Sequence, residues 1–196
     1  STQESTHDPV KHGKLLGRGL TASVFRMKMN GEIFALKRID KHVRLTKSVK
    51  KALQHEVSIL RHLQRVRSGH RHLCNFFQVY EDAKNLYLTL ELCQGGELFD
   101  YIVNNNTKHF SEKEVATLVT KIARGLRTLH MAGVVHRDLK PENVVLKYDI
   151  RKKAFPSNSL KIMDFGFSLL NGEGCEGKKS QLMVVGSPQY MAPEIC

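Results

Sequence analysis

The sequence has few cysteines and no long apolar run. None of the cysteines is spaced as Cys-x-x-Cys; they are Cys74, Cys93, Cys175 and Cys196. This excludes a dense disulfide framework and favours free thiols in a reducing compartment. No apolar stretch approaches the ~20 residues that a membrane helix needs, and residues 1–16 lack the apolar core of a signal peptide. We therefore expect a cytoplasmic or nuclear protein without a membrane partner.

Acidic residues are also scarce. The chain has 31 Lys and Arg against 19 Asp and Glu, which gives a net charge of +12 and suits an anionic ligand. The basic residues are spread from Lys11 to Lys179 without a block of five like charges. A solvated basic surface is therefore the better interpretation, and we expect no nucleic-acid partner. With 41% hydrophobic and 26% charged residues, the chain should be globular.

The first half of the chain predicts mainly strands. Residues 1–12 form a polar leader, and residues 14–39 contain short apolar stretches broken by glycines, which indicates hairpin strands. Residues 73–92 predict two more strands, with a turn at 81–85. Between these regions, apolar residues recur at steps of three and four from Ser48 onward and predict a helix; they are Val49, Leu53, Val57, Leu60 and Leu63.

The second half predicts mainly helices. Gly95 and Gly96 interrupt the chain before a short helix from Glu97 to about Asn104. Ser111 and Glu114 form a capping box. The long amphipathic helix that follows should end near Gly133, and its apolar stripe is Val115, Leu118, Val119, Ile122, Leu126 and Leu129. Short strands are expected at 144–147 and 160–163. This order predicts an α+β chain of two lobes that join near residues 91–95.

Two patterns in the first half are typical of phosphate chemistry. Residues 16–24 (LGRGLTASV) hold closely spaced glycines, which let backbone amides approach phosphate oxygens; an ordinary turn is the alternative. Lys37 lies inside an apolar strand, where a buried ammonium needs an anion. Glu56, on the polar side of the following helix, could supply it. The alternatives are a lysine that snorkels to solvent and a weak surface ion pair.

Two polar segments in the second half carry groups suited to catalysis. Residues 136–143 (HRDLKPEN) hold a carboxylate, an ammonium and an amide in one loop. Asp138 can orient a hydroxyl and accept its proton, Lys140 can neutralise a phosphoryl group, and the Asn143 oxygen can bind a hard metal ion. Asp164 follows a predicted strand and precedes Gly166, so it can hold Mg²⁺. A polar connecting loop and ordinary Asp-x-Gly turn chemistry are the alternatives.

Taken in order with residues 186–194 (GSPQYMAPE), these segments resemble the eukaryotic protein kinases, whose motif set includes GxGxxGxV, VAIK, HRDLxxxN, DFG and APE. Ala22 replaces the third glycine of the first motif. The resemblance covers about residues 13–195 and implies a bilobal fold. Residues 13–92 would form an N-lobe with an antiparallel sheet and one helix, and residues 93–196 a partial, mostly helical C-lobe. Because kinase domains extend further, it also implies a truncated chain.

The resemblance implies ATP and Mg²⁺ as cofactors. The backbone near Gly17 and Gly19 would cover the ATP phosphates, and Lys37 would contact them while pairing with Glu56. The residues around the nucleotide would be Leu16, Gly17, Gly19, Val24, Ala35, Lys37, Leu90, Glu91, Cys93 and Val145. Asp138 and Lys140 would act on the substrate hydroxyl and the moving phosphoryl, while Asn143 and Asp164 would hold Mg²⁺.

The same resemblance implies the substrate class. Lys140 and Ser187 match the serine/threonine-specific branch. Glu97 and Glu142 match acidic positions that bind basic residues upstream of the phosphorylated residue, so we expect basic-rich protein substrates. A favourable charge in the first turn of a helix is the alternative for Glu97.

Residues 95–102 (GGELFDYI) and the long segment 147–159 are most similar to the calcium/calmodulin-dependent and calcium-dependent kinases. A calmodulin-binding or calcium-sensing region would then lie outside this chain. Met183 occupies the usual phosphorylated position, so phosphorylation of Ser180 is not expected to be the main switch. The alternative function is a truncated, non-catalytic module that binds a nucleotide or a partner.

Overall fold

The computed structural model describes residues 10, 13–19, 22–42, 47–67, 70–104, 110–148, 160–170 and 185–195. The chain divides into two compact units. Unit 1 comprises residues 1–45 and 76–92, and unit 2 comprises residues 46–75 and 93–196. Their shared boundary at 92/93 falls within the predicted junction, and the segment 46–75 groups with unit 2. Several predicted features lie outside the described residues: most of the leader, the segment 149–159, Ser180 and Met183.

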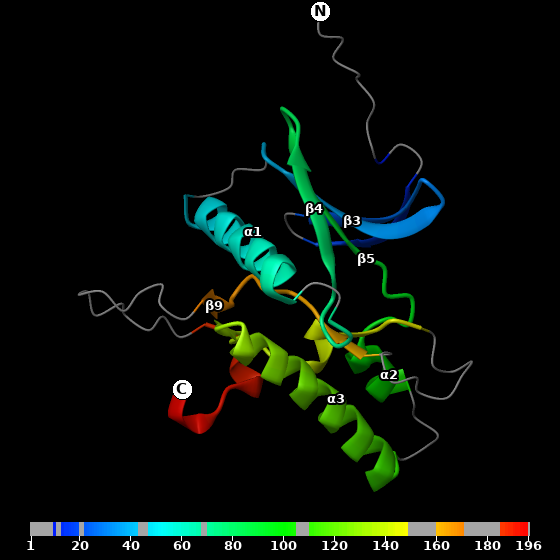
Figure 1. The fold of residues 1–196 in the computed structure, drawn as a ribbon, viewed down its shortest axis with the longest axis vertical. Helices are drawn as coiled ribbons and strands as arrows, with labels where there is room; N and C mark the ends of the chain where they lie inside the picture. Colours follow the sequence, from blue (N-terminus) through cyan, green and yellow to red (C-terminus); the bar gives the residue numbers. More distant parts are fainter. Residues whose placement is uncertain are drawn as a thin grey trace, which may run out of the picture. The chain divides into compact units, whose positions relative to one another are not determined.

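Unit 1 is built on a five-stranded antiparallel sheet in the order β1-β2-β3-β5-β4 (Figure 1). The strand pattern predicted for residues 14–39 and 73–92 is confirmed. The strands are β1 (Lys14–Arg18), β2 (Ala22–Met29), β3 (Glu32–Asp40), β4 (Phe76–Glu81) and β5 (Asn85–Glu91).

Two tight turns fix the register of this sheet. Asn30 and Gly31 connect β2 to β3 with φ values of 51° and 85°, which is the left-handed geometry of a two-residue hairpin turn. Between β4 and β5, the Asp82 carboxylate accepts hydrogen bonds from the backbone N–H of Lys84 (2.7 Å) and Asn85 (2.6 Å). The side chain therefore holds the turn together with the backbone hydrogen bond from the Asp82 N–H to the Asn85 carbonyl (3.0 Å).

Side-chain alternation gives the sheet two different faces. On one face Leu36 and Tyr87 are buried, and they pack with Phe25 and Met27. Val10, which belongs to the predicted leader, is 7% exposed and joins this cluster, so this residue is part of the core of unit 1. The opposite face carries the alternate residues of the same strands.

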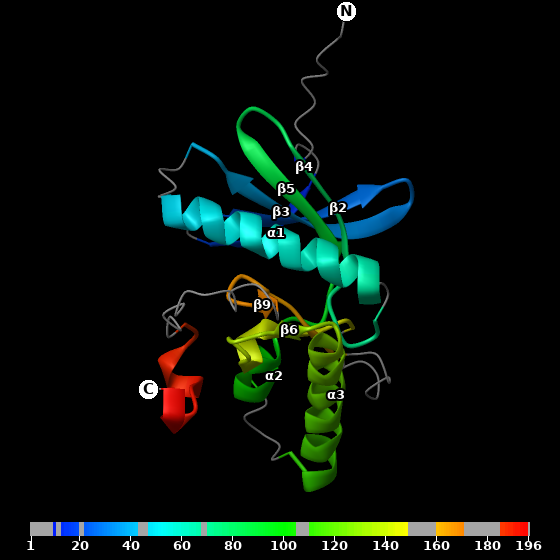
Figure 2. The ribbon, with the colours of Figure 1, turned by 60° about the vertical axis from the view of Figure 1, so that its left-hand side comes forward.

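The α-helices found among the described residues all belong to unit 2 (Figure 2). They are α1 (Lys47–Arg67), α2 (Leu98–Asn104) and α3 (Glu112–Met131), close to the predicted positions. Its strands form two antiparallel pairs, β6 (Val134–Val135) with β9 (Leu169–Leu170) and β7 (Val144–Leu146) with β8 (Leu160–Ile162). The β6–β9 pair was not predicted. No helix in the described ranges is long and apolar enough to cross a membrane.

The start of α3 is the predicted capping box. The Ser111 hydroxyl accepts from the Glu114 N–H at 3.3 Å, and the Glu114 carboxylate accepts from the Ser111 N–H at 2.9 Å. Further along, Gly125 lets α3 approach β8, since a Cβ there would lie 2.7 Å from the Ile162 side chain. The predicted stripe is buried only in part, because Leu118 and Leu129 are buried whereas Val115 and Val119 are exposed.

Two histidines attach α1 to the rest of unit 2. His55 Nε2 lies 2.7 Å from the Ser168 carbonyl oxygen, and His62 Nε2 lies 2.8 Å from the Ala132 carbonyl oxygen at the end of α3. These residues are seven apart, so they lie on one side of the helix. Glu56 is 7% exposed. The sequence places Glu56 on the polar side of the helix, and the structure buries its side chain there.

Candidate active site

In unit 1, most of the residues predicted to bind ATP lie on one face of the sheet. Val24 is directly opposite Gly17 in β1 and Lys37 in β3, and Ala35 is opposite Leu90. Directly opposed residues point to the same face, as do residues two apart in a strand. The sheet therefore presents Gly17, Val24, Lys37, Ala35 and Leu90 together, on the face opposite the Leu36–Tyr87 core.

The glycine segment leaves space on this surface. A Cβ placed on Gly17 would meet no atom within 4 Å, and the Gly19 N–H closes a turn on the Ala22 carbonyl at 2.8 Å. Leu16 sits at an irregularity in the β1–β2 pairing and is exposed. Glu91 pairs with Phe34, so its side chain points to the other face, and only its backbone can take part in the predicted nucleotide site.

Lys37 and Glu56 belong to different compact units, and their predicted pairing stays a prediction. Cys93 is a half-buried free cysteine at the start of the second segment of unit 2. The chain that follows it runs antiparallel to β7, with the Gly95 N–H donating to the Leu146 carbonyl at 2.8 Å. A Cβ at Gly95 would collide with the Tyr148 carbonyl oxygen, so glycine is required for this close approach.

The loop after β6 brings three polar side chains together around Asp138. Asn143 Nδ2 donates to Asp138 Oδ2 at 3.0 Å and to its backbone carbonyl at 2.8 Å. Lys140 Nζ lies 3.1 Å from Asp138 Oδ2. Ser187, which is far away in the sequence, accepts from Lys140 Nζ at 2.7 Å and donates to Asp138 Oδ1 at 2.9 Å. These four side chains form one continuous network.

The network keeps the Asp138 carboxylate ionised. Burial favours its neutral form, but hydrogen bonds from Lys140, Ser187 and Asn143 and the charge of Lys140 outweigh burial, so the pKa of Asp138 is lowered. Asp138 itself is only 7% exposed. A buried carboxylate with this many donors is a fixed negative charge at neutral pH that can accept a further hydrogen bond.

Backbone strain accompanies the network. Gly186 has a φ of +115°, and a Cβ there would lie 2.6 Å from the Arg137 carbonyl oxygen, so only glycine allows Ser187 to reach Asp138. Arg137 has a φ of 65° and donates from Nε to the Phe167 carbonyl at 2.7 Å. Such conformations persist where the surrounding contacts impose them, and they are common at functional sites.

Asp164 is held beside this network by the backbone. The preceding Met163 donates its N–H to the Asn143 carbonyl at 2.9 Å and accepts from His136 Nε2 at 3.1 Å. The Asp164 backbone is left-handed (φ 63°), and its carboxylate is exposed and accepts from the Gly166 N–H at 3.3 Å. Val145 of β7 pairs with Lys161 of β8, which places Val145 in the strand pair that leads to Asp164.

His136 supports this loop as a neutral ring. It is 2% exposed, and burial lowers its pKa although the Met163 carbonyl and the carboxylates Asp164 and Asp138 favour its charged form. Its ring packs edge-on against Phe165, with centroids 5.6 Å apart.

The oxygen ligands present fit Mg²⁺. Because the Asn143 amide nitrogen is committed to Asp138, its oxygen is the atom left to bind a cation, and the Asp164 carboxylate is exposed nearby along the same backbone. No group of three His, Cys, Asp or Glu among the described residues could hold a metal. Two oxygen ligands are nevertheless typical for Mg²⁺, which usually takes one or two carboxylates, waters and substrate phosphates.

A cluster of carboxylates lies beside the network. Burial, followed by the charges of Asp100 and Glu142, raises the pKa of Glu97. Glu142 Oε2 is buried and has no hydrogen-bond partner in the described part of the chain. A cation would offset the repulsion between the carboxylates and give the buried Glu142 oxygen a donor. The cluster can therefore bind a basic side chain. Asp100 was missed by sequence reasoning, although its position three residues after Glu97 on a helix would have indicated it.

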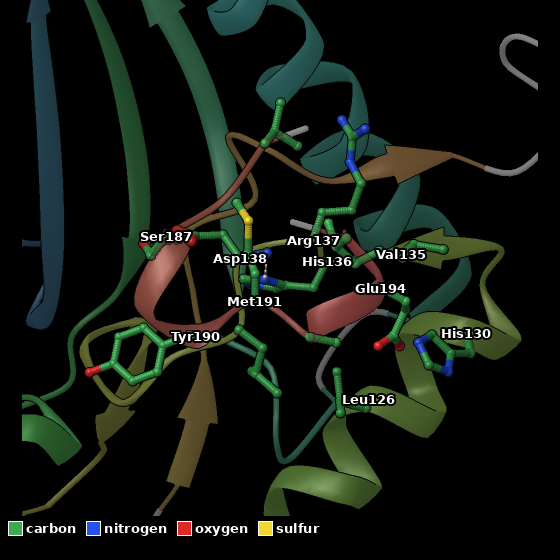
Figure 3. Close-up of a pocket in the computed structure, with 14 residues that line it drawn as sticks. Leu126, His130, Val135, His136, Arg137, Asp138, Ser187, Tyr190, Met191 and Glu194 are labelled. Atoms are coloured by element: carbon green, nitrogen blue, oxygen red, sulfur yellow. Dashed lines mark hydrogen bonds between the residues drawn. The ribbon is translucent and has the colours of Figure 1, made fainter. Parts of the chain in front are cut away.

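A cavity of about 630 Å³ opens between α3, the loop around Asp138 and residues 185–195. Figure 3 shows Asp138 and Ser187 on one side of it, away from Leu126 and His130 of α3. The sequence did not predict this cavity, because no single motif contains the residues that line it. Its other lining residues include Val135, Tyr190, Met191 and Glu194.

Comparison with known proteins identifies the family. Residues 10–196 match the model of the protein kinase domain. Calcium-dependent protein kinase 29 of Arabidopsis thaliana is 38% identical over 93% of this chain and 32% of its own length. Calcium-dependent protein kinase 19 of Oryza sativa is 36% identical over 93% and 32%. Calcium-dependent protein kinase 2 of Zea mays is 34% identical over 98% and 35%. The chain thus spans about a third of the length of these relatives.

Proposed function

Because the chain belongs to the protein kinase family, we propose that it transfers the γ-phosphate of ATP to serine or threonine hydroxyls of protein substrates. Members of this family generally use ATP and Mg²⁺. The observation that carries the proposal is the network in which Lys140, Asn143 and Ser187 all contact the Asp138 carboxylate. A structural loop would not need an ammonium, an amide and a distant hydroxyl directed at one buried carboxylate.

Each member of the network has a role in this proposal. Asp138 accepts the hydrogen bond of the substrate hydroxyl and thereby directs its oxygen toward the phosphorus, and Lys140 stabilises the negative charge of the phosphoryl group in transit. Asn143 and Asp164 hold Mg²⁺, which neutralises the phosphate charge when bound. The sheet face with Lys37 and Gly17 holds the nucleotide phosphates, and Val24 and Ala35 on the same face contact the base.

The proposed substrates are proteins with basic residues upstream of the phosphorylated residue. Burial and the nearby charges of Asp100 and Glu142 raise the pKa of Glu97, and a buried oxygen of Glu142 lacks a hydrogen-bond partner among the described residues. An arginine would supply both the missing donor and the compensating charge. The hydroxyl of Ser187, bound to both Asp138 and Lys140, supports serine/threonine specificity.

The test is phosphate transfer from radiolabelled ATP to a serine peptide with upstream arginines. We expect incorporation that requires Mg²⁺ and that falls at least about a hundredfold in Asp164→Ala and Asp138→Asn, because each removes a charge on which transition-state stabilisation depends. Asp40→Asn, an exposed carboxylate at the end of β3, is the matched control and should retain activity. Binding of ATP without any transfer would instead indicate the non-catalytic module.

The acidic cluster is tested with paired peptides. Glu97→Gln with Glu142→Gln should raise the KM for the arginine peptide and leave the KM for an alanine-substituted peptide nearly unchanged. An equal change for both peptides would contradict the proposed basic preference.

We also propose that calcium regulation, which the names of the relatives state for them, acts through a region outside this chain. Among the described residues no acidic cluster could hold a metal ion by itself. Adding Ca²⁺ to this chain alone should therefore leave its transferase activity unchanged. A calcium-dependent increase with the isolated chain would overturn this assignment.

A further inference from the structure

The exposed face of α1 is a basic stripe. Its exposed polar residues follow one another at steps of three and four, which places them in one line along the helix; they are Lys51, Gln54, Ser58, Arg61 and Arg65. The helix contains a single acidic residue, Glu56, and that side chain is buried. The stripe therefore carries positive charge without a carboxylate along it.

The stripe borders a cavity of about 400 Å³ rather than a flat surface. The polar residues along its edge are Gln54, Ser58, Arg61 and Arg65, with His62 beside them. Val57 of α1 and Leu170 of β9 complete the lining. The site thus combines two guanidinium groups, an amide and a hydroxyl with two apolar side chains in one concave surface.

Both walls of this cavity are anchored within unit 2. His62, on the α1 wall, contacts the Ala132 carbonyl at 2.8 Å, and Leu170, on the opposite wall, pairs with Val134 in the β6–β9 ladder. The distance between the walls is therefore set by contacts that do not involve the two arginines. A ligand would meet a preformed groove, which reduces the entropy lost on binding.

The arginines have no structural task that explains their position. Neither the Arg61 nor the Arg65 side chain forms a hydrogen bond or ion pair with any other residue that the structure describes. Like charges four residues apart on a helix repel each other. The helix dipole favours cations near the C-terminal end, but it does not require them to line a concave surface with Gln54 and Ser58.

We propose that this groove binds an acidic segment of a partner protein, with a carboxylate or phosphate between Arg61 and Arg65 and an apolar side chain against Val57 and Leu170. Guanidinium groups favour such anions because they form paired hydrogen bonds with them. A nucleic acid fits less well, because no phenylalanine, tyrosine or tryptophan lines the groove for base stacking. The inference is independent of the proposed catalytic function, although the groove lies on the helix that carries Glu56.

The test is direct binding, measured by fluorescence anisotropy with the whole chain. The probe is a labelled peptide of alternating glutamate pairs and leucines, and a second version carries phosphoserine in place of some glutamates. We expect saturable binding that weakens as salt rises. Tighter binding of the second peptide identifies phosphate as the preferred anion, and equal or weaker binding identifies the carboxylate.

Charge reversal locates the site. Arg61→Glu with Arg65→Glu should weaken binding by at least about tenfold, because two charge-assisted contacts are lost, while Arg61→Lys with Arg65→Lys should retain part of the affinity. The matched control is Lys113→Glu with Arg127→Glu, an equal charge change at exposed positions of α3. Circular dichroism and melting temperature check that each variant folds.

Three results would overturn the inference. They are equal affinities for the α1 double variant and the α3 control, unchanged binding when serine replaces the leucines of the peptide, and tighter binding of a single-stranded RNA than of either peptide. All three are binding measurements, so a chain without transferase activity would not affect them.

Discussion

Replacing Ser187 by alanine tests whether the Asp138 network stabilises the fold. The hydroxyl of Ser187 donates to Asp138 Oδ1 at 2.9 Å and accepts from Lys140 Nζ at 2.7 Å, so its removal breaks two hydrogen bonds to charged groups. Hydrogen bonds to charged groups contribute roughly 1.5–3 kcal/mol each. Ser187 is half-buried, and water can replace part of the loss. We therefore expect the free energy of unfolding to fall by about 1–2 kcal/mol.

The assay is urea unfolding at pH 7 with matched variants. Ser187→Thr keeps the hydroxyl and should unfold with nearly the wild-type free energy. Ser58→Ala removes an exposed hydroxyl that forms no hydrogen bond with the described residues, so its effect should stay within about 0.5 kcal/mol. A Ser187→Ala variant as stable as the wild type at pH 7 would refute the reasoning.

The pH dependence gives a second check with a definite sign. The pKa of Asp138 is lowered in the folded chain, so its ionised form contributes stability above its unfolded pKa, which is near 3.8, and this contribution is lost as the pH falls through the folded pKa. Since Ser187 is one cause of the lowered pKa, the difference between the wild type and Ser187→Ala should be largest at pH 7 and should narrow toward pH 3. A constant difference across this range would mean that the hydroxyl acts independently of the charge.

Three other substitutions test separate parts of the structure. Gly186→Ala should lower the melting temperature more than Gly96→Ala, because both glycines have positive φ (115° and 79°) but only at Gly186 would a Cβ collide, with the Arg137 carbonyl oxygen. Ser111→Ala should lower the free energy of unfolding by about 1 kcal/mol through loss of the α3 cap, and Ser111→Asp should restore it. Burial lowers the pKa of His136, so its neutral form contributes stability that is lost as the pH falls below about 6.5, and His136→Phe should reduce the loss between pH 7 and pH 5.

Local sequence signals predicted the helices and the sheet because each is encoded within a few residues. The capping box of Ser111 and Glu114 placed the start of α3 within a residue, and apolar spacing placed α1. The strands β6 and β9 were missed because two residues are too short to show alternation. These strands pair because the segment before Asp138 and the segment after Asp164 lie together, with Val135 opposite Leu169.

The residues of the candidate site were identified from their motifs, but their surroundings were not. Sequence placed Glu56 on the polar face of its helix, and the structure buries that side chain; helical periodicity cannot show which neighbours cover a face. The basic groove on α1 was missed for the same reason. Its wall at Leu170 is more than one hundred residues away from Arg61 in the sequence, and the concave surface exists only because the fold brings Leu170 to the same cavity as α1.

The lowered pKa of Asp138 limits the part it can play in the proposed transfer. A carboxylate that stays ionised well below neutral pH is a weak base, so it cannot remove the proton of a serine hydroxyl before phosphate transfer begins. It can direct that hydroxyl toward the phosphorus and accept the proton late, once transfer has made the hydroxyl strongly acidic. This timing agrees with a loose transition state, in which positioning and electrostatics supply most of the rate enhancement. Lys140 and Asn143, which hold the carboxylate in its ionised form, therefore favour orientation over basicity.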